Sequence, residues 1–116
     1  MEGLFNAGLA LDGIDIAVTI TDLEGRIVYL NPRSAEVNAG GDASKLLGEQ
    51  VRDCHSARSN AIIERLMAGE TNVYTISKKG QRKLIYQSPW RVGGEVKGLI
   101  EFSIVIPEDM PHYDRG

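Results

Sequence analysis

Two adjacent residues, Cys54 and His55, are the first in this chain whose types suggest chemistry, and they lie in the segment VRDCHSARS. A thiol and an imidazole can ligate a metal, or they can form a nucleophile and its base. Neighbouring positions on a helix point about 100° apart, so these two side chains cannot act on each other. The only other histidine, His112, lies near the C-terminus. The residues therefore predict neither an enzyme nor a structural zinc site, and they leave His55 as a candidate axial ligand of a haem.

Size and charge limit the functions that this pair can serve. The chain has 116 residues, 42% of them hydrophobic, which predicts one domain with a single core. Its formal net charge of -3 does not favour binding to nucleic acid phosphates. One cysteine cannot form an internal disulfide, no apolar run is as long as a membrane span, and residues 1–11 lack the basic start of a secretion signal. We therefore expect a cytoplasmic domain that contacts neither nucleic acid nor a membrane, either alone or as part of a larger receptor.

The first third of the chain predicts a flanking helix followed by a hairpin. Residues 1–11 contain Leu4, Phe5 and Leu9, which favour a short helix with one apolar face. Over residues 14–20, apolar and polar residues alternate, which is typical of a strand with one buried face. The turn sequence DLEGR then leads into a second strand over residues 27–30.

The middle of the chain predicts helices. Asn31 can cap a helix that begins at Pro32 and ends at Gly40 and Gly41. A second short helix is expected over residues 43–47. A longer helix follows and ends at Gly69; its apolar stripe consists of Ile62, Ile63, Leu66 and Met67.

The last third predicts three antiparallel strands, over residues 71–77, 82–92 and 95–106. Pro89 cannot donate to a ladder, so its strand must be bulged there or the proline must face an unpaired side. The first hairpin carries four cations in KKGQRK, which predicts a solvated turn, with contact to an anion or a partner as the alternative. This order of elements predicts an α+β domain in which a five-stranded antiparallel sheet has helices on one face.

Four segments in this order resemble one known family, the PAS sensory domains. They are DLEGRIVYLNPRSAEV, LLGEQVRDC, ERLMAGE and VGGEVKGLIEFSIVI. The resemblance spans residues 12–107 and leaves 108–116 as a C-terminal tail or linker. More narrowly, LLGEQVRDCHSARS is similar to a bacterial PAS subgroup with a Cys-His pair before its long helix. The resemblance implies strand order 2-1-5-4-3, a cavity between helices and sheet, and signalling to an attached or partner histidine kinase or transcription regulator.

The same resemblance bears on the cofactor without deciding it. The reactive cysteine of the light-sensing PAS branch corresponds to Val51 here, which argues against a flavin adduct. The haem-ligating histidine of another branch corresponds to Arg58 or its neighbours, about one helical turn from His55. We therefore expect a small organic ligand, with haem bound through His55 and a ligand-free dimerisation module as the alternatives. The residues predicted to line the cavity are Val18, Val51, Cys54, His55, Ile62, Leu66, Tyr86, Trp90 and Glu101.

Several of these residues also have a purely structural interpretation. Cys54 can be a small buried hydrophobe, and Tyr86 and Trp90 can simply fill the core. Glu101 can face solvent, pair with a cation such as Arg91, or project into the cavity.

The ends of the chain bear on assembly and output. The resemblance implies a homodimer that pairs through the flanking helix, at Leu4, Phe5 and Leu9. Pro107 and Pro111 in the tail prevent a continuous coiled coil from leaving the last strand directly.

Overall fold

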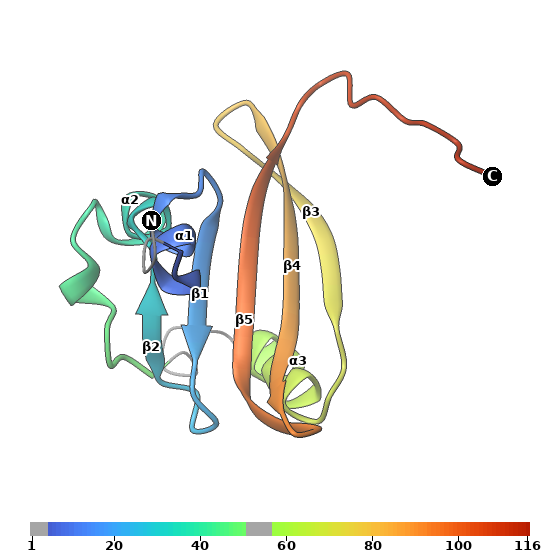
Figure 1. Cartoon of the computed structure of the whole chain (residues 1–116). Helices are drawn as coiled ribbons and strands as arrows, with labels where there is room; N and C mark the ends of the chain where they lie inside the picture. Colours follow the sequence, from blue (N-terminus) through green and yellow to red (C-terminus); the bar gives the residue numbers. More distant parts are fainter. Residues whose placement is uncertain (1–4, 51–56) are drawn as a thin grey trace.

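Five antiparallel strands form one sheet in the order β2-β1-β5-β4-β3, so the last strand of the chain lies in its centre (Figure 1). The computed structural model describes residues 5–50 and 57–116. The α+β fold and the strand order predicted from the sequence are confirmed. The elements are α1 (Ala7–Gly13), β1 (Ala17–Thr21), β2 (Ile27–Leu30), α2 (Pro32–Ala39), the 3-10 helix η1 (Ala43–Lys45), α3 (Ala57–Met67), β3 (Asn72–Lys78), β4 (Gln81–Val92) and β5 (Glu95–Ile106).

The first strand is shorter than the alternating pattern predicts. Ile14 ends α1 and is 41% exposed, and β1 begins only at Ala17. The link between them is held by Asn31, whose amide nitrogen donates to the carbonyls of Leu11 and Ile16, both at 2.8 Å. These bonds take residues 14–16 out of the sheet, which the hydrophobic pattern alone does not reveal.

Asn31 also fixes the start of α2, as its predicted capping role requires. Its Oδ1 accepts from the backbone N–H of Ser34 at 2.9 Å and from that of Val18 at 3.0 Å. The residue is fully buried. α2 then ends at Gly40, which adopts a left-handed conformation with φ of 61°. One side chain thus joins the end of α1, the start of β1 and the start of α2.

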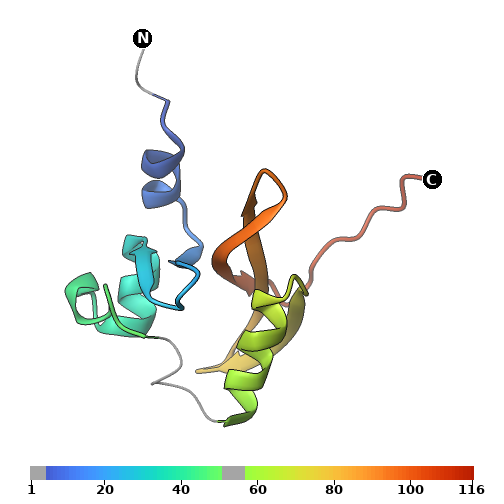
Figure 2. The ribbon, with the colours of Figure 1, turned by 90° about the horizontal axis from the view of Figure 1, so that it is seen from below.

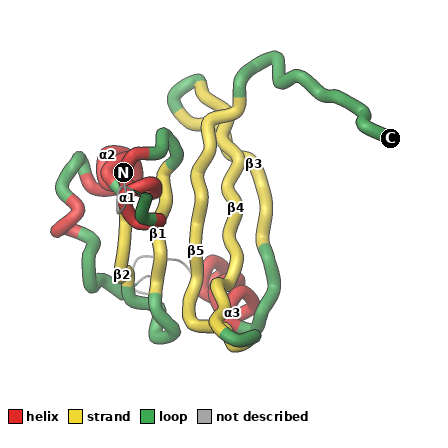
Figure 3. The backbone as a smooth tube through the Cα atoms, viewed as in Figure 1, coloured by secondary structure: helices red, strands yellow, loops and turns green. Residues whose placement is uncertain are grey.

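The three C-terminal strands form the long part of the sheet (Figure 3). The pairing of β4 with β5 shifts between Trp90 and Arg91, one residue after Pro89, which confirms the predicted irregularity. Trp90 lies opposite Gly98 on β5, and its indole N–H donates to the carbonyl of Thr21 on β1 at 2.9 Å. A Cβ atom at Gly98 would lie 2.0 Å from that carbonyl oxygen, so only glycine allows the indole to cross β5.

Two separate apolar clusters stabilise the domain. One joins Ile27 and Leu30 of β2 to Ala35 of α2, and the other joins Ile63 and Leu66 of α3 to Leu99 of β5. α2 therefore packs at the end of the sheet formed by β2 and β1, whereas α3 packs over β5 and β4, and Figure 2 shows the two helices well apart. Polar residues of the sheet, among them Thr19 and Glu101, lie between the two clusters. No helix in the ranges 5–50 and 57–116 is long and apolar enough to cross a membrane.

Candidate functional site

Two cavities lie on the face of the sheet toward α2 and α3, here called the inner face. The α2 cavity has a volume of about 140 Å³, and the α3 cavity has about 70 Å³. The α2 cavity is lined by Ala17, Thr19, Val37, Asn38, Tyr74, Ile76, Lys78, Lys83, Ile85, Glu101 and Ser103. The α3 cavity is lined by Thr19, Thr21, Ile63, Leu66, Gln87, Leu99, Ile100 and Glu101. Thr19 and Glu101 belong to both, so the two cavities meet at the middle of the sheet.

Strand register explains how a polar row comes to lie at this meeting point. Thr19 on β1 pairs with Glu101 on β5, which pairs with Gln87 on β4, which pairs with Asn72 on β3. Residues that face each other across strands share one face of a sheet, so the four side chains form one row. The amide of Asn72 donates to Gln87 Oε1 at 3.0 Å. The row crosses four strands and separates the apolar α3 cluster from the α2 cavity.

Hydroxyl groups connect the α2 cavity to the helix above it. Thr19 Oγ1 lies 2.6 Å from Ser34 Oγ, and the amide of Asn38 donates to the same oxygen at 3.2 Å. Ser34 is fully buried, and its backbone N–H is one of the groups bound by Asn31. Ser34 and Asn31 therefore link the hydrogen-bonding groups of Thr19 and Asn38 to the junction between α1 and the sheet.

The charged groups of the α2 cavity are two lysines, Lys78 and Lys83, and one carboxylate, Glu101. Lys83 is only 8% exposed. The pKa of Tyr74, which lines the same cavity, is raised by burial and further by the negative charge of Glu101, against a smaller lowering by the hydrogen bond with Gln87. The described lining thus carries one excess positive charge. In the part of the chain that the structure describes, no group of three or more His, Cys, Asp or Glu is placed to hold a metal ion.

Only some of the residues predicted to line a cavity lie on the inner face. Glu101 lines both cavities, and Leu66, 2% exposed, lines the α3 cavity. Ile62 packs beside it against the α3 cluster. Val51, Cys54 and His55 lie outside the described residues, so their proposed role stays a prediction.

The structure does not bring Val18, Tyr86 and Trp90 to the described lining of either cavity. Val18 is fully buried, but it lies between Ala17 and Thr19, which both line the α2 cavity. Because neighbouring residues of a strand point to opposite faces, its side chain belongs to the other face of the sheet. Tyr86 is 40% exposed, and Trp90 makes the bond to β1 described above.

The sequence analysis did not name Thr19, Asn38 or Tyr74, and it assigned Lys78 and Lys83 to a solvated turn, with contact to an anion or a partner as the alternative. On β4 it predicted that Tyr86 and Trp90 line the cavity, although the face that carries Lys83 and Ile85 is the more buried one. Both faces of this strand carry apolar residues, so alternation alone fits either orientation.

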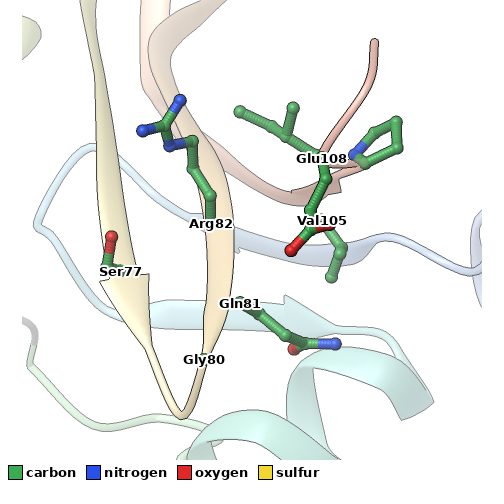
Figure 4. A pocket seen from close by; sticks show the side chains of 8 residues that line it. Ser77, Gly80, Gln81, Arg82, Val105 and Glu108 are labelled. Carbon is green, nitrogen blue, oxygen red and sulfur yellow. The ribbon is translucent and has the colours of Figure 1, made fainter.

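A larger hollow lies outside the inner face, next to the C-terminal tail (Figure 4). It measures about 470 Å³ and is lined by Ser77, Gly80, Gln81, Arg82, Val105, Ile106, Pro107 and Glu108. None of these described residues lines the α2 or α3 cavity. In Figure 4 the side chains of Gln81 and Arg82 leave β4 in different directions and do not converge on one point. We therefore assign no binding site to this groove.

The chain belongs to the PAS family. A sequence model described as PAS fold matches residues 11–109, which is most of the chain and includes all five strands. PAS domains are generally sensory and signalling modules and not enzymes. No curated protein matches the chain.

Solved structures agree with the fold. The PAS domain of BvgS from Bordetella pertussis is 23% identical, with a TM-score of 0.61, and the match covers 86% of this chain and 83% of that one. The PAS domain of the histidine kinase ThkA is 20% identical, with a TM-score of 0.63 and coverages of 78% and 99%. The Aer2 receptor from Vibrio cholerae, described as a dual PAS-haem oxygen sensor, is 21% identical, with a TM-score of 0.55 and coverages of 79% and 95%.

Proposed function

We propose that this PAS domain is a cytoplasmic sensor of a small molecule and that it regulates an attached or partner histidine kinase or transcription regulator. The observation that carries the proposal is the polar lining of the inner face. Two cavities meet there, and their lining combines apolar side chains with the hydroxyl groups of Thr19 and Thr21 and the amides of Asn38 and Gln87. A concave, partly apolar space with a few polar groups is the usual setting for a small ligand, so this lining supports a bound molecule.

The predicted residues Val51, Cys54 and His55 belong to this proposal. They follow Gln50 in the sequence and precede α3, whose Leu66 lines the smaller cavity. We expect them to contribute to the wall that faces the sheet, without a covalent reaction.

The hydrogen bonds around Asn31 support a route for the signal. A ligand that bonds to Thr19 or Asn38 competes with Ser34, whose backbone is bound by Asn31. Asn31 in turn donates to Leu11 at the end of α1. Occupancy of the cavity is expected to shift α1 relative to the sheet, and α1 is the element proposed to pair in a dimer.

The experiment that tests the sensor is native mass spectrometry of the purified chain, together with its absorption spectrum. We expect a retained small molecule, or one taken up from a metabolite extract, with a mass well below that of haem or a flavin. A Soret band that is lost in His55→Ala would replace this proposal with a haem sensor. A colourless protein that takes up no small molecule and forms concentration-dependent dimers would replace it with an interaction module.

A further inference from the structure

We propose that the domain opens locally between β1 and β5, and that Thr21 is the residue that holds these two strands together. Their contact, here called the seam, consists of four residue pairs that run from Ala17–Ser103 to Ile20–Ile100. On one side of the seam lie β1, β2 and α2, here called the β1 unit, and on the other side lie β3, β4, β5 and α3 (Figure 1). The movement is built into the fold and requires no ligand.

Apolar packing on the inner face is concentrated on the two sides of the seam and not across it. The cluster around Leu30 belongs to β2, α2 and the η1 segment, and the cluster around Leu66 belongs to α3 and β5. Both cavities lie across the seam instead: the α2 cavity is lined by Val37 on one side and Ile85 on the other, and the α3 cavity has Thr21 opposite α3. Space that side chains do not fill contributes no dispersion attraction, so the seam is held more weakly than either side.

The backbone ladder of the seam is short, and its register identifies the groups that report on it. Val18 bonds to Asn31 through both its N–H and its carbonyl, each at 3.0 Å. Because alternate residues of a strand bond to opposite neighbours, the residues on either side of Val18 bond to β5, where their partners are Glu101 and Ser103. The side chain of Val18 is fully buried and lies opposite Phe102, which keeps the seam closed at rest.

Thr21 closes one end of the seam with two hydrogen bonds. Regular pairing ends at Ile20, and Thr21 Oγ1 then accepts from the backbone N–H of Leu99 at 3.1 Å. The carbonyl of Thr21 accepts from the indole N–H of Trp90 at 2.9 Å. Thr21 is only 5% exposed, so water does not replace these partners while the seam is closed. Local opening starts at the ends of a short ladder, so these two bonds control how often the seam opens.

Opening of the seam moves α1 together with the β1 unit. Asn31 donates to Leu11 at the end of α1 and to Ile16 just before β1, and it caps α2. These elements therefore move as one body, while α3 stays on β4 and β5. The position of α1 relative to the three long strands thus depends on Thr21, at the opposite end of β1.

The test is native-state hydrogen exchange of the whole chain without added ligand, followed residue by residue by NMR. Local opening predicts that the amides of Glu101 and Ser103 are at least about tenfold less protected than those that join β3 to β4. The amides of Asn31 and Ser34, which are bonded within the β1 unit, should stay better protected than the seam amides.

Two results of that experiment would overturn the proposal. Equal protection of all three groups would show that the sheet opens only as a whole. Loss of protection at Asn31 and Ser34 together with the seam would show that the β1 unit unfolds and does not move as a body. Neither result bears on the proposed sensor, which is tested by ligand retention.

The matched variants are Thr21→Val and Thr75→Val, which make the same replacement at a buried and at an exposed position. Loss of a buried hydrogen bond should make Thr21→Val lower the protection of Glu101 and Ser103 about fivefold to tenfold, whereas Thr75→Val should change it less than about twofold. An effect confined to Leu99, whose own partner is removed, would overturn the assignment of Thr21.

A conservative variant separates this role from a general loss of stability. Thr21→Ser keeps the hydroxyl group and should keep the protection of the seam amides within about threefold of the unsubstituted protein. In Thr21→Val the amides between β3 and β4 should keep their protection, and an equal loss there would contradict a local opening. If Thr21→Val does not fold, exchange in the unsubstituted chain still decides whether the seam opens.

Discussion

At the scale of single residues, the side chain of Asn31 holds three segments of the chain together through four hydrogen bonds. All its side-chain hydrogen-bonding groups are used while the residue is fully buried. Asn31→Ala would leave buried backbone groups of three segments without partners, each at a cost of about 1 kcal/mol or more. We expect the free energy of unfolding in urea to fall by at least about 2 kcal/mol.

Asn6 provides the comparison for that measurement. It caps α1 by accepting from the N–H of Gly8 at 2.8 Å, but it is exposed. Asn6→Ala should cost no more than about 1 kcal/mol, the usual value for a helix cap. Similar losses in both variants would show that Asn31 acts only as a cap.

Tyr29 gives the fold a dependence on alkaline pH. Burial, the hydrogen bond to Asp12 at 2.5 Å and the charge of that carboxylate raise the pKa of Tyr29 to about 12. Its ordinary pKa is 10, so the unfolded chain releases this proton first. The resulting contribution to stability is complete below pH 10 and is lost as the pH rises toward 12.

We therefore expect urea unfolding midpoints to fall between pH 10 and 12, and to fall less steeply in Tyr29→Phe. Tyr113, which is 72% exposed in the tail, is the matched residue. Tyr113→Phe should follow the unsubstituted protein. A Tyr29→Phe curve that also follows it would mean that the contact with Asp12 is not maintained in solution.

At the scale of elements, the crossing of Trp90 over Gly98 joins three strands. Gly98→Ala would bring a methyl group to 2.0 Å from the Thr21 carbonyl oxygen and 2.7 Å from the indole nitrogen. Relief requires β1 and β4 to separate, so we expect a loss of about 3 kcal/mol in stability. Gly13→Ala, at a position with open space around it, should be nearly neutral in the same unfolding experiment. Comparable losses in the two would contradict the crossing.

The elements themselves were largely predictable because their signals are local. Asn31 followed by Pro32, the glycine after each helix and the turn sequences fix where helices and hairpins begin and end. The start of β1 was not predictable, since it depends on hydrogen bonds from Asn31 to carbonyls 15 and 20 residues away. The inner face of β4 was not predictable either, because Tyr86 and Ile85 fit a buried face equally well.

At the scale of the whole molecule, the prediction of a dimer can be tested through α1. Leu4 lies outside the described residues. Phe5 and Leu9 are 86% and 62% exposed, and no residue of α1 is buried. If these side chains pair, Phe5→Ser with Leu9→Ser should shift sedimentation from dimer toward monomer. Val28→Ser, a 50% exposed position on β2, serves as the control and should leave the dimer intact. A dimer that survives the double substitution would place the contact elsewhere.

The candidate site shows the limit of sequence reasoning at this scale. A cavity between helices and sheet followed from the resemblance to PAS domains, and Glu101 and Leu66 were placed at it in advance. The contribution of Lys83 depends on which way a twelve-residue strand faces, and that is decided by the packing of Ile85 among distant segments. The positive charge of the α2 cavity comes from Lys78 and Lys83 of KKGQRK, a sequence that is typical of a solvent-exposed turn, so it was not predicted.

The position of Trp90 makes the protein its own optical reporter. It is the sole tryptophan of the chain, and its indole spans from β4 to the end of β1. Any rearrangement that moves β1 away from β5 replaces the Thr21 carbonyl with water as the partner of the indole N–H, and it shifts the wavelength of the tryptophan emission. The kinetics of the response to a stimulus can thus be followed by intrinsic fluorescence, with no dye attached.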